Sequence, residues 1–296
     1  MVAEQHKISF CITCKGRLDH LQQTLPRNLE NNKDYPKVEF TILDYDSNDG
    51  LGSWLKKNFR EELDTGKIRY GHYTPAPHFK VAHAKNMAHR LATGDVVCNL
   101  DADNVTAPGF AAWLNEQFIA EPNAIIRPPG NSALRKIAGA SRTPSGARGR
   151  IAMSNENFYM LRGYDERYEG YGNEDNDLMR RALAKSLKRV MIPENMMGEA
   201  LEHPNERRVE LMAPEKQDEY YARVDSTSLG NKLHINKFRR VADRLGAIGR
   251  EANVDGRFGA LEPGATLHDI NGQDIIIEPY PHIPPKERSG ILFRTR

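Results

Sequence analysis

The chain has 296 residues, of which 39% are hydrophobic and 28% charged, and its formal net charge at pH 7 is +2. This length allows a full core in one large or two modest domains, and the composition is typical of a soluble globular protein. The near-neutral charge argues against a nucleic-acid partner, no apolar run is long enough to cross a bilayer, and residues 1–7 lack the apolar region of a signal peptide. We therefore expect a cytoplasmic protein.

The three cysteines are predicted to be structural. An odd number of cysteines in a chain without a signal peptide fits a reducing compartment. Cys11 and Cys14 have the spacing of a redox or zinc motif, but no second pair of cysteines or histidines accompanies them. Because they fall in or beside an apolar run, we interpret them, together with Cys98, as buried thiols.

The first 120 residues alternate short apolar runs with helical patterns. Apolar runs predict strands at 8–13, 38–43, 67–72 and 95–100. Periodic apolar residues predict helices at 18–29, 51–63, 81–91 and 109–120. This alternation predicts a mostly parallel, doubly wound α/β sheet with helices on both faces.

Residues 130–150 interrupt that alternation. They are rich in Gly, Ser, Ala and Arg, and we interpret them as a long loop that is either disordered or a lid. Beyond it, the pattern predicts a strand at 151–153, a helix at 155–161, a loop rich in Gly and Tyr, a helix at 174–187 and a strand at 189–192.

The character of the sequence changes near residue 213. Residues 231–250 form a basic amphipathic pattern, which indicates a helix that either docks on the core or adsorbs to an anionic membrane surface or acidic acceptor. Four prolines after residue 278 predict an irregular tail. We therefore divide the chain into a domain at 1–212 and a mainly helical and irregular extension at 213–296.

Asp101-Ala102-Asp103 is the most informative motif. It directly follows the predicted strand at 95–100, and ligands bind at the carboxyl ends of strands in open α/β sheets. Two carboxylates one residue apart suit a divalent metal that itself holds a diphosphate. The alternative interpretation is a structural turn.

Polar residues also follow the first two predicted strands. Thr13 ends the first, and Lys15 and Arg17 come next, where their cationic groups could bind a nucleotide diphosphate or lie as ordinary surface charge. Asp44 and Asp46 follow the second strand. Their oxygens suit a nucleobase or ribose edge, and equally suit a turn.

Lys85, Asn86 and His203 are further candidates. Lys85 and Asn86 lie near the start of the predicted helix at 81–91, where they could touch a nucleotide or belong to a solvated helix face. His203 stands alone in the sequence, which is typical of a structural histidine. It becomes a candidate ligand if the metal site lacks one.

The segment Tyr171-Gly172-Asn173-Glu174-Asp175 leads into a predicted helix. Acidic residues at a helix N-terminus complement the helix dipole, which is one explanation for Glu174 and Asp175. The other is functional, since two adjacent acids behind an aromatic and glycine-containing loop suit a general base beside a residue that binds a sugar hydroxyl.

Taken in this order, the segments resemble the GT-A nucleotide-sugar transferases, which have a Rossmann-like fold. The N-terminal half resembles family 2, and the second half resembles the β-1,4-galactosyltransferase type. Asn173 replaces a glycine of that type, Tyr171 replaces a tryptophan, and Ala200 stands where its methionine ligand is expected. The missing secretory cysteine pattern and membrane anchor indicate a bacterial-type cytosolic relative, located in the cytoplasm or peripherally at the inner face of the membrane.

The resemblance implies a nucleotide-binding half at about 1–105 and an acceptor half at about 106–212. It implies a UDP-sugar donor, a glycan, glycolipid or other hydroxyl acceptor in polysaccharide biosynthesis, and Mn²⁺ or Mg²⁺. Asp103 and His203 would hold the metal, with Asp101 as a further ligand or a nucleotide contact. Asp175 would be the base of an inverting transfer, and Glu174, with residues 171–173, would bind the acceptor.

Three alternative functions remain open at this point. One is a retaining transferase of the same fold. Another is a sugar nucleotidyltransferase, but residues 14–17 are too poor in glycine for the phosphate-binding loop of such an enzyme. The third is a non-catalytic sugar-nucleotide-binding protein, against which both acidic pairs argue.

Overall fold

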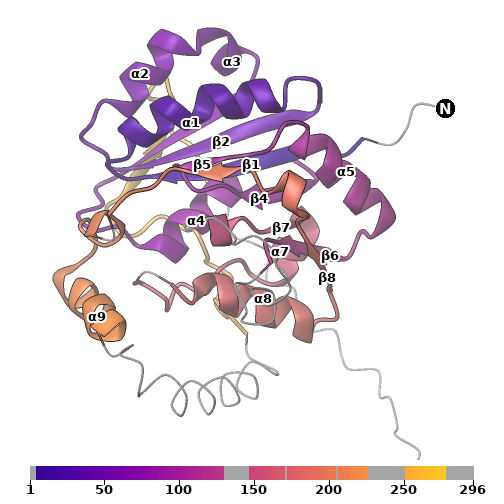
Figure 1. Cartoon of the computed structure of the whole chain (residues 1–296). Helices are drawn as coiled ribbons and strands as arrows, with labels where there is room; N and C mark the ends of the chain where they lie inside the picture. Colours follow the sequence, from indigo (N-terminus) through magenta and orange to yellow (C-terminus); the bar gives the residue numbers. More distant parts are fainter. Residues whose placement is uncertain (1–4, 130–146, 171, 205, 226–250, 278–296) are drawn as a thin grey trace, which may run out of the picture.

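A mixed β-sheet runs through the centre of the computed structural model, which describes residues 5–129, 147–170, 172–204, 206–225 and 251–277 (Figure 1). Within these residues the sheet has eight strands in the spatial order β10-β3-β2-β1-β4-β7-β6-β8. The strands are β1 (Ile8–Cys14), β2 (Val38–Tyr45), β3 (Ile68–Thr74), β4 (Val96–Asn99), β6 (Ala124–Arg127), β7 (Ala152–Ser154), β8 (Lys188–Met191) and β10 (Thr266–His268). A separate pair, β5 (Asn104–Val105) and β9 (Glu199–Ala200), lies beside it.

The helices form a layer on each face of the sheet (Figure 1). They are α1 (Leu18–Asn31), α2 (Leu51–Asn58), α3 (Arg60–Asp64), α4 (Val81–Leu91), α5 (Phe110–Ala120), α7 (Asn155–Met160), α8 (Glu174–Ala184) and α9 (Pro214–Asp225). One apolar cluster joins α1, α2 and α5 to the sheet, and a second joins α4, α7 and α8 to it. The sheet is therefore the middle of three layers, as expected for a doubly wound fold.

The core strands are parallel, and their sequences explain their position. Ile8 pairs with Val38 on one side of β1 and with Val96 on the other, all in parallel register. All eight residues of β2 are buried, which is typical of a parallel strand covered on both faces. β7 and β10 run antiparallel to their neighbours, so the sheet is mostly but not entirely parallel.

Most predicted elements are confirmed. The helix predicted at 51–63 is two helices, because Phe59 leaves helical geometry and packs its ring edge-on against Trp54. β5, β6, β9 and β10 are absent from the predicted strands, since each has only two to four residues, and helix α9 was not predicted as a separate element. The basic helix predicted at 231–250 and most of the loop predicted at 130–150 lie outside the described residues.

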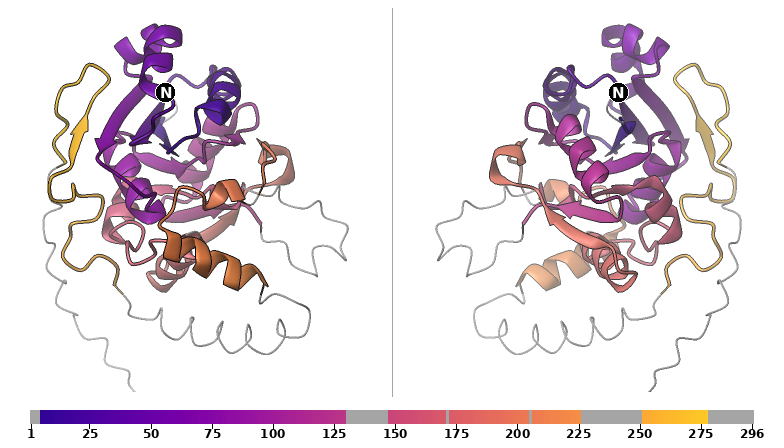
Figure 2. Two further views of the ribbon diagram at one scale, coloured as in Figure 1. Left: turned by 90° about the vertical axis from the view of Figure 1, so that its left-hand side faces the viewer. Right: turned by 90° about the vertical axis from the view of Figure 1, so that its right-hand side faces the viewer.

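A strand from the C-terminal extension completes the sheet. Thr266 pairs with Thr74 and His268 with His72, which places β10 antiparallel to β3 at the sheet edge. Figure 2 shows this yellow strand running along the outside of the sheet. The division at residue 212 stays a prediction, but the extension contributes directly to the central sheet.

Candidate active site

The carboxyl ends of β1, β4 and β6 and the start of α8 surround one pocket of about 560 Å³. It brings together most of the residues that the sequence singles out: Thr13, Lys15, Arg17, Lys85, Asp101, Asp103, Gly172, Asn173, Glu174, Asp175 and His203. Asp44, Asp46 and Asn86 are not among its lining residues, and Tyr171 lies outside the described part of the chain. Segments far apart in sequence thus converge where the fold predicts a ligand.

Asp103 and His203 face each other on one wall of the pocket. His203 Nε2 lies 3.1 Å from Asp103 Oδ2, and His203 Nδ1 lies 2.9 Å from the carbonyl oxygen of Pro204. Burial raises the pKa of Asp103, but hydrogen bonds from His203 and Asn104 outweigh it, so the pKa lies below its usual range. Asp103 is therefore held as a carboxylate.

This pair fits a divalent cation. Both ring nitrogens of His203 face oxygen acceptors, so a neutral imidazole must direct one nitrogen lone pair at an oxygen, and a cation shared by Nε2 and Asp103 would relieve this contact. No group of three or more His, Cys, Asp and Glu side chains within the described ranges is arranged to hold a metal unaided. The donor set therefore suits a cation that takes its other ligands from a bound substrate, as Mg²⁺ commonly does with phosphates.

Asp101 lies close to Asp103 on one side and to Asp175 on the other. Its Oδ1 accepts a hydrogen bond of 3.0 Å from Asn99 Nδ2. Burial, together with the charges of Asp103 and Asp175, raises the pKa of Asp101 to about 6, although Lys85 opposes the shift. A concentration of negative charge that raises a carboxyl pKa is a favourable place for a cation.

Glu174 and Asp175 share one ammonium group at the start of α8. Lys85 Nζ lies 2.9 Å from Glu174 Oε1 and 2.8 Å from Asp175 Oδ1, and it stacks 5.1 Å from the Tyr164 ring centroid. Burial lowers the pKa of Lys85, but the charges of Asp175 and Glu174 raise it by more, so the pKa lies above its usual value and the ammonium stays charged. The structure thus gives Lys85 two carboxylate partners, and its predicted contact with a nucleotide stays untested.

The two acids differ in what they leave available. Asp175 uses Oδ1 for Lys85, which leaves Oδ2 for the pocket. Glu174 is only 2% exposed, and its Oε2 has no hydrogen-bond partner among the described residues. A buried carboxylate oxygen without a hydrogen-bond donor costs free energy, so a ligand hydroxyl that donates to Glu174 Oε2 would be favoured here.

Lys15 is committed to the protein backbone. Its Nζ donates to the carbonyl oxygens of Tyr45, Asp46 and Ala76 at 3.1, 3.1 and 2.6 Å. A lysine has three N–H donors, so a contact with a diphosphate would have to replace one of these bonds. Arg17 also lines the pocket, and its guanidinium pairs with Glu210 at 3.0 Å.

Asp44 and Asp46 have the turn chemistry that the sequence left as an alternative. Asp44 accepts from the backbone N–H of Ser47 and from the hydroxyl of Tyr70. Asp46 accepts from Thr74 Oγ1 and from the backbone N–H of Ala76. Both carboxylates therefore shape the loop after β2, and their predicted nucleotide contacts stay untested.

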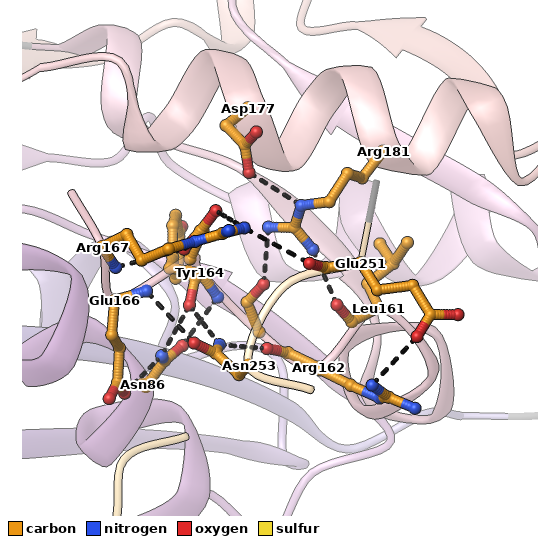
Figure 3. A network of polar contacts seen from close by, with 12 residues as sticks. Asn86, Leu161, Arg162, Tyr164, Glu166, Arg167, Asp177, Arg181, Glu251 and Asn253 are labelled. Carbon is orange, nitrogen blue, oxygen red and sulfur yellow. Dashed lines mark hydrogen bonds and ion pairs between the residues drawn. The ribbon is translucent and has the colours of Figure 1, made fainter. Parts of the chain in front are cut away.

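Asn86 is held in a network away from the pocket lining, and its predicted nucleotide contact stays untested. Asn86 is fully buried, and its amide bonds to the backbone N–H and carbonyl of Tyr164 and to Glu166 (Figure 3). Asn253 from the C-terminal extension donates to the carbonyls of Arg162 and Tyr164 in the same network. Asn86 therefore fixes the loop between α7 and α8 and points away from the pocket.

Four arginines that line the pocket were not predicted as site residues, and one of them, Arg207, pairs with Asp19. Arg127 ends β6, Arg189 lies on β8 and Arg148 precedes Gly149. Arg127 and Arg189 lie near strand ends, and that position could have marked them as site candidates. However, β6 is too short to be recognised from its sequence. The cysteine interpretation, in contrast, is confirmed for burial: Cys11, Cys14 and Cys98 are free and buried.

The family model of glycosyl transferase family 2 matches residues 9–168, more than half of the chain. The chain belongs to glycosyl transferase family 2. A second model, described as the N-terminal domain of galactosyltransferase, matches residues 132–206. This family 2 member is therefore a glycosyltransferase of GT-A fold with a galactosyltransferase-like region, as both halves of the sequence resemblance predicted.

Solved structures share the fold of this glycosyltransferase at low identity. The mannosyltransferase PcManGT from Pyrobaculum calidifontis, in complex with GDP-Man and Mn²⁺, is 18% identical with a TM-score of 0.57, over 83% of this chain and 75% of its own. TarS 1–349 from S. aureus, in complex with UDP-GlcNAc, is 14% identical with a TM-score of 0.54, over 82% and 80%. GalNAc-T7 with UDP, GalNAc and Mn²⁺ is 18% identical with a TM-score of 0.52, over 84% and 57%.

No curated protein matches the sequence significantly. Among the helices in the described residues, none has the length and apolar character needed to cross a membrane.

Proposed function

We propose that this glycosyltransferase moves a sugar from a nucleotide-sugar donor to a hydroxyl group of a glycan, glycolipid or other acceptor, with inversion at the anomeric carbon. One observation carries the proposal: a single pocket holds two separate pairs of side chains, Asp103 with His203 and the adjacent acids Glu174 and Asp175. The first pair suits stabilisation of a leaving group, and the second suits activation of a nucleophile. Related folds hold GDP-Man, UDP or UDP-GlcNAc, which supports a sugar nucleotide as the donor.

Asp103 and His203 are the residues assigned to a divalent cation, Mn²⁺ or Mg²⁺, with Asp101 as a further ligand or a contact to the nucleotide. Such a cation supplies Lewis-acid neutralisation of the charge on a departing diphosphate. The two structures that hold Mn²⁺ in the same fold support this choice. The chain's own contribution is to keep Asp103 ionised through His203 and Asn104.

Thr13 and Arg17 are assigned to the nucleotide, because both line the pocket at the end of β1. Lys15, Asp44 and Asp46 are assigned to shaping the loop that this nucleotide would contact. The hydrogen bonds that they make to that loop support this role.

Asp175 is assigned as the general base through Oδ2. Lys85 binds Oδ1, which fixes the orientation of the carboxylate. A base opposite the leaving group implies inversion, through a transition state with oxocarbenium character. Gly172, Asn173 and Glu174 are assigned to the acceptor, with the unpaired Oε2 of Glu174 accepting from an acceptor hydroxyl.

The first test is nucleotide release from a panel of UDP-, GDP-, CMP- and dTDP-sugars, with Mn²⁺ and with EDTA. We expect slow release from one donor, in the presence of Mn²⁺ only. The Asp103→Ala variant should lose metal-dependent donor binding, measured by calorimetry. Metal-independent release, or unchanged donor affinity in Asp103→Ala, would remove the cation from this site.

The second test concerns the base. Asp175→Asn should lower the rate of transfer by about 10²- to 10⁴-fold, which is the usual contribution of a positioned base. Donor affinity should stay the same, since the substitution does not touch the donor side. Asp218→Asn, on the exposed surface of α9, is the matched control. Loss of donor binding in Asp175→Asn, or a product with retained anomeric configuration by NMR, would contradict the assignment.

A further inference from the structure

The cationic side chains that line the pocket fall into two groups. Among the described residues, Lys85, Arg17 and Arg207 each pair with a carboxylate, and Lys15 donates to three carbonyls. No ion pair in that same part of the chain joins Arg127, Arg148 or Arg189 to a carboxylate. These three residues, the arginine cluster, leave their positive charge available to a ligand.

The arginine cluster is more than a set of solvated surface side chains. Arg148 and Arg189 are exposed, but Arg127 is half-buried, and its Nε is buried without a hydrogen-bond partner. Burial lowers the pKa of Arg127, and the positive charges of Arg189 and Arg148 lower it further, against the opposing effect of Asp175. Like charges held together with an unsatisfied donor are stabilised by an anion.

The position of the cluster indicates which substrate brings that anion. In the sheet, β2 and β1 carry the predicted nucleotide residues, β4 leads to the Asp101–Asp103 motif, and β6 and β8 carry Arg127 and Arg189 on the far side. Arg127 also reaches the start of α8, where its NH1 lies 3.3 Å from Asn176 Oδ1, beside the proposed base. The cluster is therefore on the acceptor side of the site.

We infer that Arg127, Arg148 and Arg189 bind an oxyanion group of the acceptor, such as a phosphate or carboxylate near the hydroxyl that receives the sugar. This inference rests on the proposed function. Guanidinium groups bind such oxyanions with paired, planar hydrogen bonds, which gives orientation as well as affinity. An anionic acceptor would thus be held with its nucleophilic hydroxyl close to Asp175.

Sulfate is a suitable probe because the acceptor is unidentified. Its affinity would be measured by calorimetry on the full chain saturated with Mn²⁺ and the nucleoside diphosphate found in the donor panel, with sodium chloride at matched ionic strength as the reference. The wild-type chain should bind sulfate under these conditions. Arg127→Gln/Arg189→Gln should weaken that binding about tenfold or more, as expected for the loss of hydrogen bonds to a charged group.

Controls separate this result from misfolding. Arg60→Gln, on the exposed helix α3 where Arg60 pairs with Asp64, should bind sulfate like the wild-type chain. The milder variant Arg148→Gln, at an exposed position, should weaken sulfate binding in the same direction. Affinity for the nucleoside diphosphate should be the same in all these variants, which shows that the pocket is intact.

Three outcomes would overturn the inference. The first is sulfate binding that is absent from the wild-type chain or unchanged in the cluster variants. The second is sulfate binding that the nucleoside diphosphate abolishes, which would place the anion in the donor site. The third is a loss of affinity in the variants for a UDP-uronate but not for a neutral UDP-sugar, which would assign the anion to the donor sugar. Sulfate binding measured with Mn²⁺ alone, without turnover of any donor, would instead contradict the proposed function and leave the anion site standing.

Discussion

At Gly149 the backbone passes between two carboxylates of the candidate site. A Cβ atom at this position would lie 2.8 Å from Asp101 Oδ2 and 3.3 Å from Asp175 Oδ2. The Gly149 carbonyl also accepts a hydrogen bond from Asn99, which in turn holds Asp101. The absence of a side chain at this one residue therefore sets how closely Asp101 and Asp175 approach each other.

Gly149→Ala should consequently disturb the site without disturbing the fold. At least one carboxylate must move, and a displacement of about 1 Å can cost about 10²-fold in rate. We expect a lower rate of transfer with an unchanged midpoint of thermal unfolding. Gly170→Ala is the matched control, since its Cβ would meet only ordinary contacts at 3.8 Å or more. Full activity in Gly149→Ala would show that the spacing of the two acids is not critical.

At the scale of a single element, α4 carries two buried basic side chains, one charged and one neutral. Lys85 stays charged between two acids, whereas His89, one turn later, stays neutral. The His89 ring stacks on Phe158 at 4.5 Å, and Nδ1 lies 2.7 Å from the Lys85 carbonyl, to which it donates. Burial, together with the Lys85 charge, lowers the pKa of His89 to about 3, although the hydrogen bond opposes the shift.

The neutral histidine makes stability depend on pH. Its pKa in the folded chain is about 3 and its ordinary value is 6.5, so the unfolded chain binds a proton first as the pH falls. The contribution of His89 to the free energy of unfolding should therefore be largest above pH 6.5 and should fall by up to about 1.4 kcal/mol per pH unit below it. That loss should level off near the folded pKa.

Urea unfolding at pH 4, 5, 6 and 7 tests this expectation. His89→Gln should show a slope of unfolding free energy against pH that is shallower than that of the wild-type chain. His78→Gln, at an exposed position, should keep the wild-type slope. Equal slopes for His89→Gln and the wild-type chain would mean that the buried imidazole is not the group responsible.

At the scale of the whole molecule, the sequence predicted the layered fold and most of the pocket. Long periodic segments such as 81–91 and apolar runs such as 8–13 are governed by burial alone, so their patterns are sufficient. The residues at their ends then follow, because parallel strands place their carboxyl ends at one edge. This is why Asp103, His203 and Asp175 converge as expected.

The rest depended on contacts between distant segments, which a linear pattern does not contain. Asn86 was expected at the pocket, but its pairing with residues 164 and 166 turns it inward. Lys15 is drawn to three carbonyls, one of them 61 residues away. The arginine cluster depends on β6, which has four residues and gains its stability from β7 and β8 rather than from its own sequence.

The pairing of β10 with β3 also has a consequence for how the chain folds. Thr266 donates to the carbonyl of Thr74 across 192 residues, so this closure carries a large loop entropy and forms slowly. Until it forms, β3 presents a row of unpaired backbone groups on an edge strand. Such an edge can pair with another chain, so the nascent sheet passes through an aggregation-sensitive interval that ends when β10 covers it.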